Sequence, residues 1–153
     1  CGSPLILEPG PKHIHPLAEK HWPAILALDA KVFGVSRGPL LRSLATDSRR
    51  VLIYESGGFI GGFGMLRNGA LATYLGPIIA EPGIGEPLAR SLLFGHGDQP
   101  IFWDIPDINK PASSLARKLG FSFLRPLTRM YLDTNLIASD PFGQWAITDP
   151  ATG

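Results

Sequence analysis

The sequence predicts one mixed α/β domain in which a mostly antiparallel sheet carries helices on both faces. A length of 153 residues suits a single compact domain. Hydrophobic residues make up 44% of the chain and charged residues 18%, so a core can offset the entropy lost on ordering. The hydrophobic period switches between helical and strand spacing in the order β-α-α-β-β-β-α-β-α-β-β.

The first half of the chain predicts a short strand, two helices and a three-stranded meander. Residues 1–11 are rich in Pro and Gly, and we expect them to be an irregular lead-in to one domain over residues 12–153. Apolar residues at helical spacing predict a helix from Glu19 to Phe33 and a shorter one after Ser36. An Asn-Gly dipeptide before the last strand of the meander is a strong hairpin signal. The expected strands are 12–15, 51–54, 59–66 and 70–80.

In the second half of the chain, predicted helices and strands alternate. A Gly-containing loop after residue 80 leads into a helix that ends near Gly95. The next helix begins with Asp107 or Asn109 as its N-cap and ends at Gly120. The strands expected here are 101–105, 121–132 and 142–147.

Charge and composition exclude several classes of function. The formal net charge is +1, and the basic residues are scattered apart from Arg49 and Arg50, so we expect no nucleic-acid partner. Pro, Gly or a charge interrupts every apolar run before the roughly 18 residues that a membrane span needs. The single cysteine, Cys1, excludes an internal disulfide and fits a reducing compartment, so cytoplasm is the expected location. We interpret Cys1 itself as an arbitrary boundary.

Three histidines near the start of the chain match a metal site in composition only. His13 and His15 would share one face of the first strand, with His21 nearby. No carboxylate or cysteine lies at a ligand spacing from them. We therefore interpret the three as surface histidines and expect no bound metal.

Four groups of residues are informative through their order and spacing. They are Asp29-x-x-x-Phe33-Gly34-x-x-Arg37-x-x-Leu40-Leu41, Arg67-x-Gly69 with Leu75-Gly76-Pro77, Asp104-x-Pro106-x-x-Asn109-x-x-Ala112, and Gly120-Phe121-x-x-x-Arg125-Pro126-x-Thr128-Arg129-Met130. In these groups and in its element order, nearly the whole chain resembles the GNAT (GCN5-related N-acetyltransferase) superfamily. More narrowly, it resembles the C-terminal half of bacterial tandem-GNAT proteins.

The resemblance implies the fold of an acyl-CoA-dependent acyltransferase, in which two strands, here ending at Ala80 and near Ile105, splay apart to admit the pantetheine arm. The diphosphate of such a cofactor needs free backbone N–H groups in a loop that leads into a helix N-terminus. Backbone N–H groups at the end of the first splayed strand would polarise the thioester carbonyl. The cofactor-binding residues implied are Ile79, Ala80, Gly83, Gly85 and Asn109.

Three further residues are candidates for acting on the acceptor. Asp104 borders the splay, where it could accept a proton from the acceptor amine or orient it; the alternative is an ion pair or cap at the strand end. Arg125 and Arg129 lie four residues apart on an expected strand and share a face, where they could bind a carboxylate of the substrate. A structural ion pair with Asp29 or Asp104 is the alternative for these arginines.

Departures from the family pattern predict a degenerate cofactor site. Ala80 stands where the family usually has Arg or Gln before the Gly-x-Gly loop. Ala116 stands where it usually has a Tyr that protonates the leaving thiolate. Glu81 adds negative charge beside the diphosphate position, and Pro87 removes a backbone donor.

Residues and resemblance together predict a GNAT-fold N-acetyltransferase domain that transfers acetyl from weakly bound acetyl-CoA to an unidentified small-molecule or peptide amine. The alternative is a non-catalytic half of a tandem protein that shapes the acceptor pocket or an interface. Phe142, Trp145 and Ile147 make the last strand largely apolar, so we expect a homodimer through it, or a missing N-terminal GNAT half. The same side chains could equally complete the domain's own core.

Overall fold

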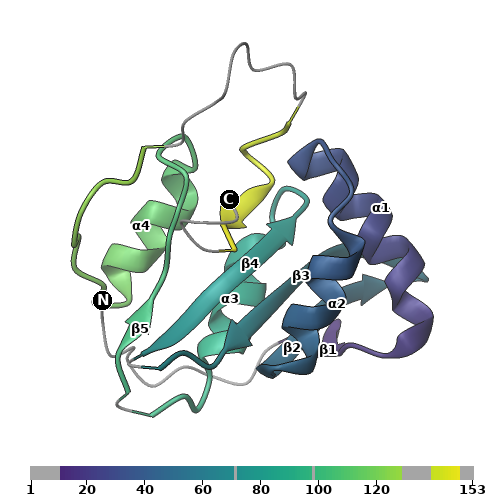
Figure 1. Cartoon of the computed structure of the whole chain (residues 1–153), viewed down its shortest axis with the longest axis horizontal. Helices are drawn as coiled ribbons and strands as arrows, with labels where there is room; N and C mark the ends of the chain where they lie inside the picture. Colours follow the sequence, from purple (N-terminus) through teal and green to yellow (C-terminus); the bar gives the residue numbers. More distant parts are fainter. Residues whose placement is uncertain (1–10, 71, 98, 129–138, 149–153) are drawn as a thin grey trace.

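The computed structural model describes residues 11–70, 72–97, 99–128 and 139–148, which form one sheet with helices on both faces (Figure 1). The expected mixed α/β class is confirmed. The strands are β1 (Ile14–Pro16), β2 (Ser48–Ser56), β3 (Phe59–Arg67), β4 (Thr73–Ala80), β5 (Ile101–Phe102) and β6 (Gln144–Ala146). The helices are α1 (Trp22–Phe33), α2 (Gly38–Thr46), α3 (Gly85–Leu93) and α4 (Lys110–Lys118), with a 3-10 turn, η1 (Glu19–His21), before α1.

The sheet combines an antiparallel meander with one parallel pair. Strands β1 to β4 pair antiparallel with their sequence neighbours, and β5 pairs parallel with β4. β5 ends at Phe102, three residues before its expected end at Ile105, because the chain then diverges from β4 and loses that partner. β6 pairs antiparallel with β4 on the same side as β5.

The two faces of the sheet carry different helices and different halves of the core. Helices α1 and α2 pack on one face, where Ile25 meets Phe63 and Met65 of β3 in one buried cluster. Helices α3 and α4 pack on the other face, where Leu88 and Leu92 belong to a second buried cluster. None of the helices in the described ranges combines the length and the apolar character that crossing a membrane requires.

The strand expected over residues 121–132 is wrong for its described part. Residues 121–128 form no strand, and residues 129–132 lie outside the described ranges. Phe123, in the middle of this segment, is 83% exposed. The apolar alternation in 121–128 imitates a half-buried strand, but Pro126 has no N–H to give to a ladder, and none of the described strands pairs with this segment.

A buried ion pair joins α1 to the start of α2. The Arg37 guanidinium donates from Nη2 to Asp29 Oδ1 at 2.7 Å and from Nε to Asp29 Oδ2 at 3.1 Å, and it stacks over the Phe33 ring at 3.6 Å. Its Nη1 donates to Thr148 Oγ1 at 3.0 Å, just after β6. The first motif of the sequence is therefore a structural unit, and Asp29 pairs with Arg37 rather than with Arg125.

Replacing Asp29 with Asn should lower the free energy of unfolding by about 3–5 kcal/mol, because the Arg37 charge would stay buried without its counter-ion. Chemical denaturation measures this change. The matched control is Glu19→Gln, which removes the carboxylate of the exposed Arg42–Glu19 pair and should cost less than about 1 kcal/mol. Equal effects of the two substitutions would contradict a structural role for the buried pair.

Candidate functional site

The parallel strands β4 and β5 splay apart, and β6 lies in the gap. They pair only at residues 73–74 and 101–102. Farther along β4, Ile78 pairs with Ala146 and Ile79 with Gln144 of β6. Figure 1 shows β6, in yellow, between β4 and the green chain that continues from β5. Residues 142–148, here called the C-terminal segment, thus fill the splay between these strands.

Backbone hydrogen bonds hold this segment on both sides of the gap. On the β4 side, Ala80 N–H donates to the Gly143 carbonyl at 3.0 Å. On the β5 side, Ile147 N–H donates to the Asp104 carbonyl at 3.0 Å. Asp104 therefore borders the splay, where its backbone anchors the C-terminal segment. Its proposed role toward an acceptor amine stays a prediction.

Asn109 uses both ends of its side-chain amide within the protein. Its Oδ1 accepts from Ala112 N–H at 3.1 Å, so Asn109 is the N-cap of α4, one of the two residues that the sequence offers for this position. Its Nδ2 donates to the carbonyls of Phe142 at 3.1 Å and Gln144 at 2.9 Å. Because Asn109 is only 2% exposed, these contacts occupy the donor that the family resemblance assigns to the cofactor.

Trp145 packs its ring on the first residue of α3. A Cβ atom at Gly85 would overlap ring atoms of Trp145, so this glycine is required by the close approach of the indole. Trp103 Nε1 donates to the Trp145 carbonyl at 2.9 Å and fixes the same residue from the β5 side. The structure therefore gives Gly85 a packing role, whereas its role in holding a diphosphate stays a prediction.

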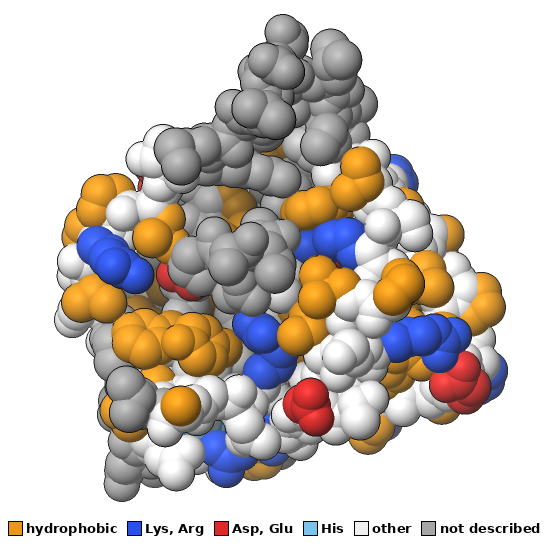
Figure 2. Space-filling view, in the orientation of Figure 1, with side chains coloured by type: hydrophobic (Ala, Val, Ile, Leu, Met, Phe, Trp, Pro, Cys, Tyr) orange, Lys and Arg blue, Asp and Glu red, His pale blue; other side chains and the backbone are white. Residues whose placement is uncertain are grey.

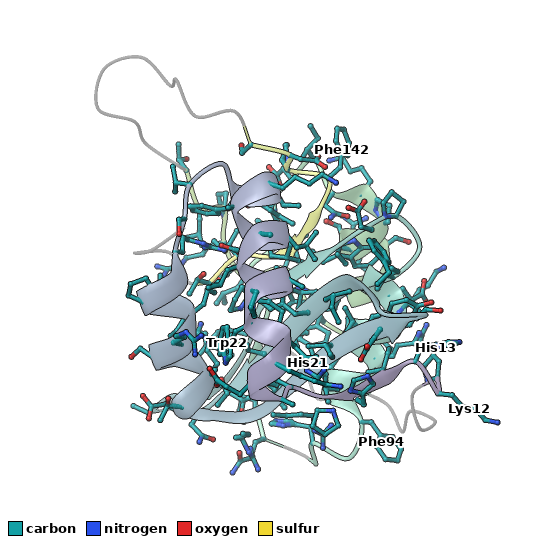
Figure 3. All side chains as sticks on the ribbon, turned by 90° about the vertical axis from the view of Figure 1, so that its right-hand side faces the viewer. Lys12, His13, His21, Trp22, Phe94 and Phe142 are labelled. Atoms are coloured by element: carbon teal, nitrogen blue, oxygen red, sulfur yellow. The ribbon has the colours of Figure 1, made fainter. Side chains whose placement is uncertain are left out.

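The burial of Trp145 also bears on the expected dimer surface. Trp145 is 8% exposed within this domain, so it completes the domain's own core, which was the alternative reading of the strand. Phe142, by contrast, is 63% exposed and lies near the C-terminal end of α1 (Figure 3). Dimerisation stays a prediction. Trp145 is too buried to be part of the contact surface of such a dimer.

A cleft of about 1000 Å³ opens at the end of β4, beside α3 and the C-terminal segment. Three of the expected cofactor residues, Ala80, Gly83 and Asn109, line it. Gly83 has a φ of +83° and open space around its Cβ position, which suits a loop that approaches a ligand. Ile79 is 1% exposed and belongs to the buried cluster under α1 and α2, so it does not line the cleft.

Both basic side chains that line the described part of the cleft are paired with carboxylates. Lys31 Nζ lies 2.7 Å from Glu81 Oε1, and this hydrogen bond and charge raise the pKa of Lys31. Arg90 Nη2 lies 2.9 Å from Glu86 Oε1, one helical turn away. Asp140 lines the same cleft and adds a further carboxylate. An anionic ligand would therefore meet cations that are already neutralised.

The remaining predicted site positions lie apart from this cleft or outside the described residues. Arg125 is exposed on the irregular segment after α4, and Arg129 lies outside the described ranges, so a shared strand face is not formed over the part described. Ala116 is buried on α4 and offers no hydroxyl. Binding of an acceptor by the two arginines stays a prediction.

Of the three histidines expected at the surface, His13 is exposed and His15 is partly exposed, whereas His21 is buried. His21 is 6% exposed, and its Nδ1 accepts from Ala18 N–H at 2.9 Å. His15 Nε2 lies 3.1 Å from Glu55 Oε2, so each ring has a local partner. Figure 3 shows His21 beside the start of α1 and His13 farther out along the chain. Within the described ranges, no three His, Cys, Asp or Glu side chains form a group that could hold a metal ion.

Sequence reasoning does not identify the side chains that anchor the C-terminal segment. Arg67 donates from Nε to the Gly76 carbonyl at 2.7 Å and from Nη2 to the Thr148 carbonyl, and Arg37 reaches the Thr148 hydroxyl. Both arginines belong to the quoted motifs, which was the available signal. Nothing in the local sequence around Thr148 marks it as their common acceptor.

On the face shown in Figure 2, the coloured basic side chains lie between hydrophobic and acidic ones. They form no continuous basic surface among the described residues on that face. A protein that binds the phosphate backbone of nucleic acid commonly gathers its Lys and Arg in one stripe or patch. This face does not have that arrangement.

The chain matches the family model of the acetyltransferase (GNAT) domain over residues 25–141. None of the curated proteins is significantly similar to it in sequence. Among solved structures, it is similar to the ribosomal-protein-S18-alanine N-acetyltransferase of Escherichia coli, at a TM-score of 0.63 and 18% identity, over 73% of this chain and 78% of that chain.

Two further solved structures have the same fold. A candidate acetyltransferase of Pyrococcus horikoshii superimposes at a TM-score of 0.69 and 21% identity over 99% of this chain, which spans only 49% of that protein. AAC(6')-Iy, solved in complex with the bisubstrate analog CoA-S-monomethyl-acetylneamine, superimposes at a TM-score of 0.57 and 15% identity, over 79% of this chain and 97% of that chain. At these identities the likeness is one of fold.

Gly85→Ala should lower the free energy of unfolding by about 1–3 kcal/mol, because the new methyl group overlaps the Trp145 ring. In a Trp145→Ala background the same substitution should cost much less. A double-mutant cycle by chemical denaturation measures this coupling. Purely additive effects would mean that Gly85 is required for a reason other than the indole.

Proposed function

The chain belongs to the family of GNAT acetyltransferase domains, and from this we propose that it is a domain of an N-acetyltransferase. It would transfer an acetyl group from acetyl-CoA to an amine, and its cofactor site is degenerate. The observation that carries the proposal is the splay of β4 from β5 with a cleft at its mouth. The acceptor class is a small-molecule or peptide amine. Pocket shape rather than motif would select among such amines.

The hydrogen-bond donors around the splay are of the types that an acyl-CoA needs. The Ala80 N–H and the Asn109 amide are donors suited to the amides and the thioester carbonyl of an extended arm. Gly83 opens the loop that leads into the N-terminus of α3, where backbone N–H groups favour an anion. Acetyl-CoA would supply the activated acyl group, and the residues of this chain would orient it and exclude water.

Several features support weak binding. The Ala80 and Asn109 donors are already satisfied by the C-terminal segment. Lys31 is neutralised by Glu81, and Pro87 withholds one backbone N–H from the first turn of α3. With Ala116 in place of a hydroxyl-bearing residue, a leaving thiolate would leave unprotonated or take its proton from water.

A second candidate function is a non-catalytic half that shapes an acceptor pocket or an interface beside a catalytic half. The position of β6 in the splay favours it, because the segment takes the place that a cofactor arm would need. The span of 49% on the Pyrococcus horikoshii protein leaves room for a second half in a protein of that length. Such a half would bind no acetyl-CoA at any practical concentration.

Calorimetric titration with acetyl-CoA should give a dissociation constant weaker than micromolar. Glu81→Gln should tighten it roughly three- to tenfold, since the substitution removes a like charge and frees Lys31 for the diphosphate. Glu19→Gln, which removes an exposed carboxylate that does not line the cleft, is the control and should leave the dissociation constant unchanged. Submicromolar binding by the unmodified chain would contradict the degenerate site. Lack of binding by both chains at millimolar acetyl-CoA would favour the non-catalytic half.

A further inference from the structure

We propose that β6 is an internal competitor for the arm of acyl-CoA, so that the strand and the arm use the same edge of β4 in turn. The proposal rests on the proposed function, since it takes acetyl-CoA as the ligand. It adds that the weakness of binding comes from the occupied edge of β4, and that the site itself is preserved beneath β6.

The first argument is chemical equivalence at the edge of β4. Ala80 N–H donates to the Gly143 carbonyl, and residues 78 and 79 pair with β6 as in an added strand. A pantetheine arm is also an extended chain that carries amide N–H and C=O groups. An exposed strand edge binds such a chain by the same main-chain hydrogen bonds with which it binds a peptide. Both ligands therefore satisfy the same β4 groups, and they exclude each other.

The second argument concerns how β6 is held. β6 spans three residues, and so short a strand gains little from pairing alone. Its position depends on side-chain donors from other elements, and two of these are Trp103, which donates to the Trp145 carbonyl, and Arg37, which donates to the Thr148 hydroxyl just after β6. Neither of these two donors is among the groups expected to hold the cofactor. The hold on β6 can therefore be weakened without changing the proposed cofactor donors.

The third argument concerns the route by which β6 could leave. The segment begins at Phe142, which is 63% exposed and lines the cleft of about 1000 Å³. The buried part, from Gln144 to Ala146, follows it. Release from the exposed end would open the β4 edge toward the cleft. Because Trp145 must leave the core, the open state is rare, and the apparent affinity falls in proportion to its population.

Two substitutions test the competition by loosening β6. Trp103→Phe removes the hydrogen bond to the Trp145 carbonyl, and Thr148→Val removes the hydroxyl to which Arg37 Nη1 donates. Each should raise the affinity for acetyl-CoA roughly two- to tenfold, because a destabilised closed state increases the open fraction.

Controls are Trp22→Phe, the same exchange on α1, and Ser48→Ala, which removes a 2.7 Å hydrogen bond to the Leu44 carbonyl. Neither control should change the affinity.

Hydrogen exchange on the unmodified chain gives a second readout that needs no variant to fold. Ile147 N–H donates to the Asp104 carbonyl only while β6 is in place. Saturating acetyl-CoA should accelerate exchange at Ile147 and leave Ala80 protected, since the arm replaces the strand at β4.

The outcomes separate the two levels of the proposal. Binding of acetyl-CoA with unchanged exchange at Ile147, or with no gain in the two loosened variants, overturns the competition and leaves the proposed function standing. Absence of acetyl-CoA binding in the unmodified chain and in both loosened variants overturns the competition and the proposed cofactor together.

Discussion

The pairing of β6 with β4 is the interaction on which the rest of the structure depends. Once β5 diverges from β4, the buried N–H and C=O groups of β4 have no partner on that side. Unpaired backbone groups in a core cost about as much as a lost hydrogen bond each, so the fold must supply a replacement. β6 is that replacement. Trp103 and Asn109 donate to carbonyls of β6 itself, and Arg37 and Arg67 donate to Thr148 just after it.

Arg37 shows how one buried cation can connect distant parts of the chain. Its guanidinium donates two hydrogen bonds to Asp29 of α1 and one to Thr148, and its flat face stacks over the Phe33 ring. Burying a charge is costly unless its counter-ion and its remaining donors are satisfied, and here the same contacts do both. The orientation of α1 relative to α2 and the position of the C-terminal segment are thereby coupled. A disturbance on either side would reach the other through this group.

Much of the fold could be predicted from the sequence because its signals are local. Hydrophobic period, the glycine after α1 and the Asn cap of α4 identify the element order, and Ala80, Gly83 and Asn109 do meet at one cleft. The irregular structure of residues 121–128 could not be predicted, because an alternation of apolar and polar residues looks the same whether or not a partner strand is present. The use of the Asn109 amide by residues 142–144 was also out of reach. It is a long-range contact, and no local pattern records which carbonyl a buried amide will meet.

The distance along the chain between β4 and β6 has a consequence for synthesis. β4 is made first, and its partner follows only after α3, β5 and α4 have all been translated. At the usual rate of translation, the edge of β4 that β6 will occupy stays unpaired for roughly several seconds in every new molecule. During that interval the nascent chain carries an open strand edge of the kind that sticks to other chains or to chaperones. The number of residues between β4 and β6 thus sets how long the edge of β4 stays unpaired in each new molecule.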